Sequence, residues 1–265
     1  MLIALFTVRI RLSQVFSTSK NNVVMKVINE AMTCALCLKQ RELCESHIVP
    51  EFFYKNLYDD RHLAQLVEVG QDKEAFLRKG FREHLLCKEC ENFLNTQYES
   101  YVASVWQSKF PGQDDGEAYT VNGLDFARFK LFHLSVLWRA SVSNLSFFKN
   151  VFLGKHEEKI RAMLLSKNPG RSDIYTISGS TSIYEGAPLH GVTEPVVKKI
   201  RSHTVYLFRF GGCLWRYWVA SHSSRGLVAN PFEADKPLVL PKIAIEDDYQ
   251  LLRIVYESLL PDTIN

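Results

Sequence analysis

The chain has 265 residues, of which 46% are hydrophobic, and a formal net charge of +3. A chain of this size can bury a sizeable core in one or two domains. No stretch reaches the roughly 18 to 20 continuous apolar residues that a membrane-spanning helix needs, so we expect a soluble, cytoplasmic protein without a membrane contact. Six cysteines, most of them in two close pairs, favour a reducing compartment.

The first 24 residues are basic and rich in serine and threonine, and they contain no acid. This composition is shared with transit peptides and, less well, with secretory signals. A second methionine, Met25, begins a more ordinary run nine residues before the first cysteine pair. We therefore treat residues 1–24 as an extension, a loosely docked strand or a targeting segment, and we favour the first two interpretations.

Two Cys-x-x-Cys pairs, Cys34 with Cys37 and Cys87 with Cys90, are the strongest chemical signal in the chain. Each pair can hold one edge of a tetrahedron, and four thiolates complete a structural zinc site. Such a site would cross-link distant segments, because residues 38–86 separate the pairs. A redox dithiol or a pair of disulfides is the alternative, but neither pair has a thioredoxin-like strand-to-helix context.

His47, in the sequence Ser-His-Ile-Val-Pro, lies between the two pairs and is a candidate general base. A neutral imidazole can take a proton from water while a divalent cation stabilises the charge that develops on a phosphodiester. Glu91 follows the last cysteine, and Asn95 and Glu99 are expected on the same face of the helix that begins there. Their oxygens suit Mg²⁺ or Mn²⁺. The alternative is that the acids form a solvated helix face and His47 bonds a loop carbonyl.

The segments CALC, SHIVPEFFYK and LLCKECENFLNTQYE resemble the zinc-bracketed branch of the HNH endonuclease superfamily over about residues 34–100. The resemblance implies a ββα-metal core, in which a two-stranded ribbon carries the general-base histidine and a helix supplies a metal ligand. His47 matches the general base. Glu91 stands where many relatives have a ligand histidine.

The chain departs from the pattern of this superfamily at two positions. Ser46 stands where many active relatives have an acid or a second histidine before the base, and a hydroxyl is a much poorer metal ligand. The middle asparagine is not visible in residues 80–86. Arg82, Glu83 or His84 would have to take the role of this asparagine.

Downstream, the pattern predicts helices followed by strands. The helix after the second cysteine pair is expected to run to Lys109, and the polar residues 111–116 mark a boundary between a domain at 25–110 and a domain at 117–265. Further helices are predicted over 124–148, 154–167 and 247–260, and strands over 173–178, 204–210 and 213–221, with a proline-marked loop at 231–241. The predicted fold class is α+β: a zinc-stapled HNH-like core, then a helical and antiparallel-sheet region.

Positive charge is concentrated in residues 139–216, which hold 12 Lys and Arg against 5 Asp and Glu. Ten of these side chains could form a phosphate-binding surface beside the zinc core. They are Arg139, Lys149, Lys155, Lys159, Arg161, Lys167, Arg171, Lys198, Lys199 and Arg201. No base-reading motif is recognisable, so the sequence predicts no sequence specificity.

These features support two functional hypotheses. The first is a metal-dependent endonuclease that hydrolyses DNA, with structural Zn²⁺ at the cysteines, catalytic Mg²⁺ or Mn²⁺, and His47 as the general base. By analogy with the resembled superfamily, such an enzyme would act in antiviral defence, together with a partner protein. The second is a non-catalytic zinc module that binds nucleic acid or protein.

Overall fold

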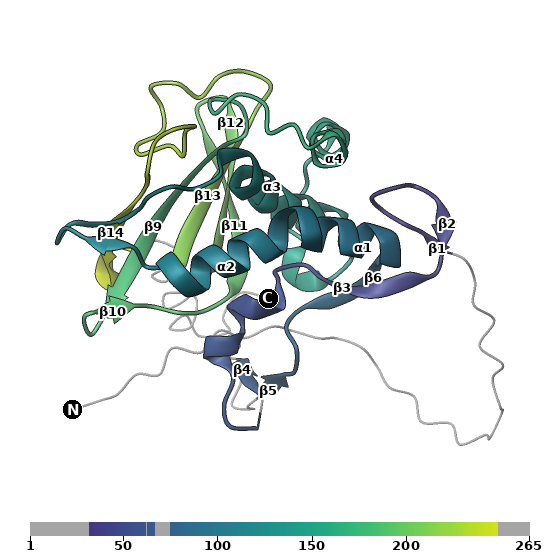
Figure 1. Ribbon diagram of the computed structural model, residues 1–265, viewed down its shortest axis with the longest axis horizontal. Coiled ribbons are helices and arrows are strands. Elements are labelled where there is room, and N and C mark those ends of the chain that lie inside the picture. Colours follow the sequence, from purple (N-terminus) through teal and green to yellow (C-terminus); the bar gives the residue numbers. More distant parts are fainter. Residues whose placement is uncertain (1–31, 62, 67–74, 249–265) are drawn as a thin grey trace, which may run out of the picture.

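The computed structural model of the chain describes residues 32–61, 63–66 and 75–248, which form a mixed α+β structure (Figure 1). The N-terminal segment 1–24 lies outside the described residues, as does nearly all of the helix predicted over 247–260; only the short 3₁₀ turn Ile245–Asp247 is seen there. Across the described residues, no helix has the length and apolarity needed to cross a membrane.

The cysteine region is built on a two-stranded antiparallel sheet followed directly by a helix. Strand β3 (Leu43–His47) pairs with β6 (Arg82–Cys87), and α1 (Lys88–Leu94) begins at the next residue. A π-helical turn (Asn95–Glu99) then leads into α2 (Ser100–Lys109). The smaller elements are β1 (Met32–Thr33), β2 (Gln40–Arg41), the 3₁₀ turns Glu51–Phe53 and Lys55–Leu57, β4 (Ala64–Leu66) and β5 (Ala75–Leu77).

The second half of the chain forms an eight-stranded sheet with the order β11-β12-β13-β9-β14-β8-β7, and β10 pairs with β9 beside this path. All pairs are antiparallel except β14 with β9. The strands are β7 (Gln113–Asp114), β8 (Ala118–Val121), β9 (Thr176–Tyr184), β10 (Ala187–Pro188), β11 (Thr193–Ile200), β12 (His203–Phe210), β13 (Cys213–Val219) and β14 (Leu238–Ala244).

Helix α3 (Phe126–Val142) is the central element of the core. It begins at Asp125, whose carboxylate accepts a hydrogen bond from the Arg128 backbone N–H, and most of its residues are buried. It lies with α2 on one face of the sheet (Figure 1), where the rings of Phe129 and Trp106 contact Trp215. After the 3₁₀ turn Ser146–Phe148, α4 (Lys155–Ser166) packs against α3.

One cluster of buried apolar residues extends from Cys34 to Leu240, so the cysteine region and the sheet share a core. The α+β class predicted from the sequence is confirmed, and the strands predicted over 204–210 and 213–221 form a hairpin, β12 and β13, that turns at Gly211 and Gly212. The domain boundary predicted at 111–116 stays a prediction. That segment contains β7, which pairs with β8 of the second region.

The sheet is larger than predicted because β7, β8, β10, β11 and β14 were not recognised, and the last three of these contain proline. Pro241 lies in β14, where residues 238–241 pair with β8 and residues 242–244 pair with β9. Pro195 lies in β11 at an irregularity between Thr193 and Val196. Proline removes a ladder N–H, so it is tolerated where the pairing is interrupted or changes partner. The prediction of a loop over 231–241 was therefore wrong for its C-terminal part.

Candidate metal centre and histidine site

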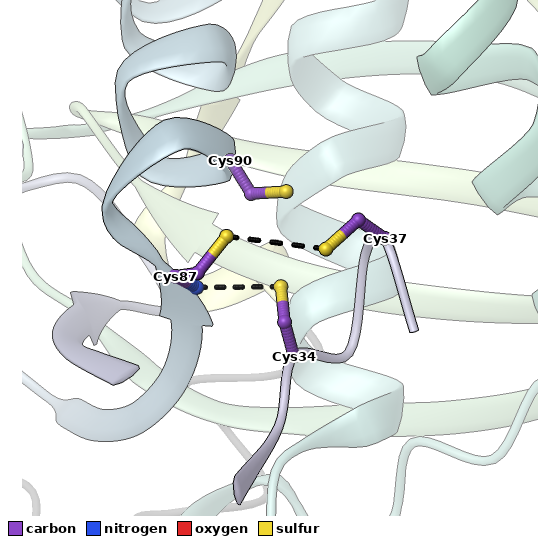
Figure 2. Close-up of side chains that lie close together, drawn as sticks. All are labelled: Cys34, Cys37, Cys87 and Cys90. Carbon is purple, nitrogen blue, oxygen red and sulfur yellow. Dashed lines mark hydrogen bonds between the residues drawn. The ribbon is translucent and has the colours of Figure 1, made fainter. Parts of the chain in front are cut away.

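The four paired cysteines converge at one place (Figure 2). Their sulfur atoms all lie within 4.8 Å of one another, and the Sγ atoms of Cys37 and Cys87 are 3.9 Å apart. Tetrahedral zinc with bonds of about 2.3 Å places its sulfur ligands about 3.8 Å apart, so the cluster needs only a small contraction to fit the ion. The four cysteines could therefore hold a structural metal ion such as zinc.

The first cysteine pair lies in a tight turn between β1 and β2. The backbone N–H of Leu38 donates to the carbonyl of Cys34 at 2.9 Å, and Leu38 has a φ of 61°. The Cys87 backbone N–H donates to the Cys34 sulfur at 3.3 Å. These bonds aim both pairs at a common point.

Electrostatics within the cluster favour a cation. Burial opposes ionisation of Cys34, but nearby backbone N–H groups outweigh it and hold the pKa of its thiol at about 7. Burial raises the pKa of Cys87 to about 11, and burial together with the neighbouring thiols raises the pKa of Cys90 further. Four thiolates this close repel one another, so they ionise together only when a metal ion balances their charge.

Neighbouring elements hold the first cysteine turn in place. Arg161 of α4 donates from Nη1 to the Leu36 carbonyl at 2.5 Å, and the Ala35 N–H donates to the Leu85 carbonyl of β6 at 3.1 Å.

The remaining cysteines do not belong to the cluster. Cys213 is buried in the sheet, where burial raises its pKa to about 12, and Cys44 is half-buried on β3.

Strand β3 directs its last two residues to opposite sides, as alternation along a strand requires. Ser46 is fully buried, and its hydroxyl donates to Glu91 Oε2 at 2.7 Å while accepting from the Leu86 N–H at 3.2 Å. The His47 ring instead contacts the Lys79 carbonyl and the Glu51 carboxylate. The structure thus brings Glu91 to Ser46 and gives His47 a different set of contacts.

The contacts of His47 fix its tautomer. Its Nε2 lies 2.8 Å from the Lys79 carbonyl and 2.8 Å from Glu51 Oε2. Both oxygens can only accept hydrogen bonds, because a backbone carbonyl and an ionised carboxylate have no proton to donate, so Nε2 carries a proton and, in the neutral ring, Nδ1 keeps a lone pair. Within the described residues Nδ1 has no partner, and the side chain is 25% exposed. His47 can therefore accept a proton from water at Nδ1.

Glu99 and Asn95, the other predicted site residues, have different environments. Glu99 Oε1 lies 2.7 Å from Nη2 of Arg139, which is buried and donates from Nη1 to the His47 carbonyl at 2.8 Å. Asn95 is exposed and accepts a hydrogen bond from Ser100 at 3.2 Å. The π-helical turn at Asn95–Glu99 interrupts the 3.6-residue period on which the expected common face of Glu91, Asn95 and Glu99 depended.

The three residues considered as replacements for the middle asparagine bind elsewhere. Glu83 accepts hydrogen bonds from Ser143 and Asn144, which follow α3. Arg82 pairs with Glu45 at 2.7 Å, and His84 Nδ1 lies 3.1 Å from the Leu43 carbonyl. Arg82 lies opposite His47 in the β3–β6 pairing, but in the described part of the chain none of the three side chains bonds to the side chain of His47 or Glu91.

Several side chains of the predicted basic surface are already occupied. Arg139 is buried, and Arg161 and Arg171 pair with Glu158 and Asp173. Three lysines gather instead around His156, whose pKa is lowered by burial and by their positive charge; they are Lys159, Lys155 and Lys199. The surface available for phosphate is therefore smaller than the sequence suggested.

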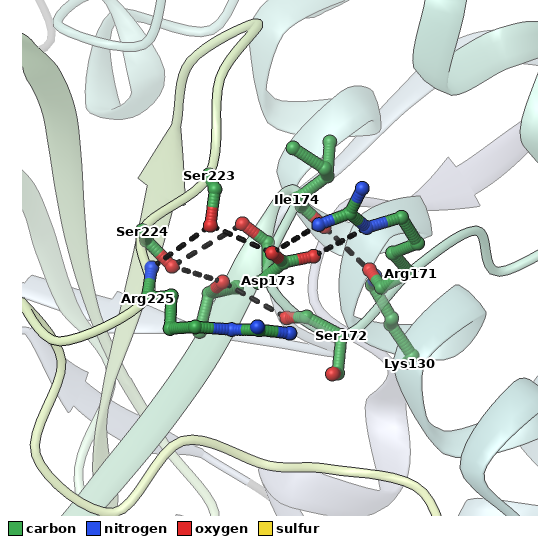
Figure 3. Close-up of polar contacts among 9 residues, drawn as sticks. Lys130, Arg171, Ser172, Asp173, Ile174, Ser223, Ser224 and Arg225 are labelled. Carbon is green, nitrogen blue, oxygen red and sulfur yellow. Dashed lines mark hydrogen bonds and ion pairs between the residues drawn. The ribbon is translucent and has the colours of Figure 1, made fainter.

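A second polar cluster joins the start of β9 to the loop after β13 (Figure 3). Asp173 accepts hydrogen bonds from Arg171 and from Ser223, at 2.5 and 2.6 Å, and these bonds hold the pKa of its carboxyl well below the ordinary range. The adjoining cavity is only about 70 Å³. Because the donors and acceptors satisfy one another, this cluster ties two loops together and is not a candidate site.

No family model matches the chain, and comparisons with curated proteins and with solved structures found no match. The resemblance to HNH endonucleases therefore rests on the motifs quoted above.

Sequence reasoning missed Glu51 and Arg139 as neighbours of His47. Glu51 follows His47 by four residues, and the bend at residues 48–49 before Pro50 returns its carboxylate to the ring.

Proposed function

We propose that the protein is a metal-dependent endonuclease of the HNH type that hydrolyses phosphodiester bonds in DNA. The observation that supports this proposal is the contact of His47: its Nε2 is bonded to the Lys79 carbonyl, and Nδ1 has no partner among the described residues, so it can accept a proton. The ring projects from a strand whose partner, β6, supplies Cys87 and leads directly into α1. This order of strand, strand and helix is the one expected of a ββα-metal core.

In the proposed reaction, His47 Nδ1 takes a proton from a water molecule as the water oxygen forms a bond to phosphorus. The bond from phosphorus to the leaving oxygen breaks, and that oxygen takes a proton from solvent. The ring orientation needed for this transfer is fixed by the Nε2 contact and by Arg139, which holds the His47 backbone carbonyl at 2.8 Å.

Glu91 is the residue that would hold catalytic Mg²⁺ or Mn²⁺ in this proposal, and such an ion would supply stabilisation of the negative charge on the phosphate. Glu91 is half-buried, and its Oε2 accepts the Ser46 hydroxyl while Oε1 has no partner among the described residues. One carboxylate oxygen is enough to bind Mg²⁺, because this ion takes most of its other ligands from water and from the phosphate of the substrate. The four cysteines would hold structural zinc, which fixes α1 and hence Glu91.

A non-catalytic zinc module that binds nucleic acid or protein is the second candidate. The observation in its favour is that the acids of the proposed site are already engaged: Glu91 by Ser46 and Glu99 by Arg139. In that case the contacts of His47 would hold the β3–β6 sheet in shape. The defence role stays a prediction from resemblance alone.

Plasmid cleavage with Mg²⁺ or Mn²⁺ separates the two candidates when zinc content is measured on the same preparations. We expect wild type to cut, and His47→Ala to reduce the rate by about 100-fold or more, the usual contribution of a general base. His84→Ala is the matched control, because His84 lies on β6 and bonds a carbonyl without reaching the site. It should cut like wild type, and all three proteins should retain equal zinc.

Glu91→Ala should also lose cleavage while keeping its zinc. If wild type cuts neither double-stranded nor single-stranded DNA with either metal, the endonuclease proposal fails and the binding module is favoured. Equal cutting by wild type and His47→Ala would show that the activity does not use this site.

A further inference from the structure

Tyr58 is hydrogen-bonded to one carboxylate oxygen of Glu51, and the other oxygen lies beside the ring of His47. The Tyr58 hydroxyl donates to Glu51 Oε1 at 2.6 Å, and Glu51 Oε2 lies 2.8 Å from His47 Nε2. Burial and the bond to Glu51 raise the pKa of Tyr58 well above its ordinary value, so the phenol remains a donor. The carboxylate is therefore held with one oxygen on the tyrosine and the other on the histidine.

The second Nε2 contact, the Lys79 carbonyl, is fixed by a turn that packs on an aromatic ring. Lys79 and Gly80 both have positive φ, at 60° and 63°. A Cβ added at Gly80 would meet the Tyr54 ring at 2.7 Å, so glycine is required there. Because the turn cannot shift easily, the carbonyl is a rigid acceptor for the Nε2 proton.

The two acceptors act on His47 in different ways. The Nε2–H bond is aligned with the Lys79 carbonyl, whereas Glu51 Oε2 is buried and accepts no well-aligned hydrogen bond despite its short distance. The carbonyl thus fixes the tautomer. The carboxylate supplies negative charge, which is most stabilising after Nδ1 has taken a proton and the ring is an imidazolium.

We propose that Glu51, oriented by Tyr58, is a positioning residue that holds the His47 ring and stabilises its protonated form during phosphodiester hydrolysis. This inference rests on the proposed endonuclease function. The water proton ends on Nδ1 as the oxygen–phosphorus bond forms, and the Glu51 charge offsets the positive charge created on the ring. Glu51 itself touches neither water nor phosphate in this step.

Cleavage kinetics of Glu51→Gln test the role, because glutamine keeps the size of the side chain but removes its charge. We expect kcat to fall about 10-fold to 100-fold, as for other residues that orient a catalytic histidine, with KM changed by less than about 3-fold. Tyr58→Phe should lower kcat by a smaller factor in the same manner. Glu45→Gln is the matched control: Glu45 is an acid of β3 that pairs with Arg82, and no contact between it and the His47 ring is seen among the described residues.

¹⁵N-histidine NMR of the full chain measures the contact between Glu51 and the His47 ring independently of cleavage. The His47→Gln variant identifies the signal of His47. Wild type should show His47 as the Nε2–H tautomer with a slowly exchanging proton. In Glu51→Gln that proton should exchange faster with water, whereas in Glu45→Gln it should not.

The two measurements separate the two proposals. If wild type does not cut but Glu51→Gln changes the His47 signal, the endonuclease proposal fails and the positioning contact stands. If wild type cuts and Glu51→Gln keeps its kcat, the positioning role is overturned while the endonuclease remains. An Nδ1–H tautomer in wild type would overturn the positioning role whatever the cleavage result.

Discussion

Lys130 shows how one buried side chain makes stability depend on pH. It is 1% exposed on α3, and its Nζ donates to the carbonyls of Arg171 and Ile174 at 2.5 and 2.8 Å (Figure 3). Burial lowers its pKa from 10.5 to about 7, although the charge of Asp173 acts in the opposite direction. Between these two pH values the unfolded chain binds more protons than the folded chain. The contribution of Lys130 to stability therefore rises with pH in this window and is lowest below pH 7.

Lys130→Met removes this titration. We expect the free energy of unfolding of wild type, minus that of Lys130→Met, to increase between about pH 7 and pH 10, by at most about 1.4 kcal/mol per pH unit. Urea unfolding at several pH values measures it, with the exposed Lys159→Met as the control. A difference that stays constant across the window would contradict the burial of a neutral amine.

The roles of single residues were predictable only in part. The convergence of the four cysteines followed from their spacing, because a Cys-x-x-Cys turn has few other uses in a reduced protein. That Glu91 contacts Ser46 and His47 has other contacts did not follow. The contact arises because Ser46, and not His47, faces α1. A sequence motif does not show which of two adjacent strand residues faces a neighbouring helix.

At the scale of elements, the four-cysteine cluster connects the turn after β1 to the end of β6 and the start of α1. Loss of one ligand should release all three. We expect Cys90→Ser to lose its zinc and to lower the free energy of unfolding by several kcal/mol, since a bound structural zinc contributes about 10 kcal/mol or more in small zinc domains.

Cys44→Ser is the matched control for this change, because Cys44 lies on β3 outside the cluster and is only half-buried. It should retain zinc and near-wild-type stability. Metal content by mass spectrometry and thermal unfolding of the same samples measure both effects. Full zinc retention in Cys90→Ser would show that the four thiols do not form one site.

The helices were easier to predict from the sequence than the strands. The apolar stripe predicted over 124–148 became α3 and the 3₁₀ turn Ser146–Phe148, and the helix predicted over 154–167 became α4. Both have an apolar pattern long enough to indicate a helix, and in α3 the apolar residues cover most of its surface. Strands β11 and β14 contain prolines that argue against a strand, and their pairing depends on partners far away in the sequence.

At the scale of the whole molecule, the cysteine region and the sheet share one core. Phe53, from the segment between β3 and β4, contacts the rings of Phe132 on α3 and Phe210 on β12. Arg139 crosses from α3 to Glu99 and to the His47 carbonyl. The candidate site is therefore completed by residues of the second region, although all of its predicted members lie in the first.

A shared core predicts one cooperative unfolding transition. Zinc release, followed with a chromogenic chelator, should have the same urea midpoint as the fluorescence of the tryptophans, which report on the second region through Trp138 and Trp215. Zinc release at a clearly lower urea concentration would mean that residues 25–110 unfold as a separate domain.

The central claim is that His47 of the zinc-bound protein activates water to hydrolyse DNA. The most direct measurement is cleavage in H₂¹⁸O with Mg²⁺ or Mn²⁺, followed by mass spectrometry of the new termini. We predict one ¹⁸O atom in the terminal phosphate for each cut by wild type, and about 100-fold fewer labelled termini from His47→Ala with the same zinc content. Wild type that produces no labelled termini, or His47→Ala that produces as many, would contradict it.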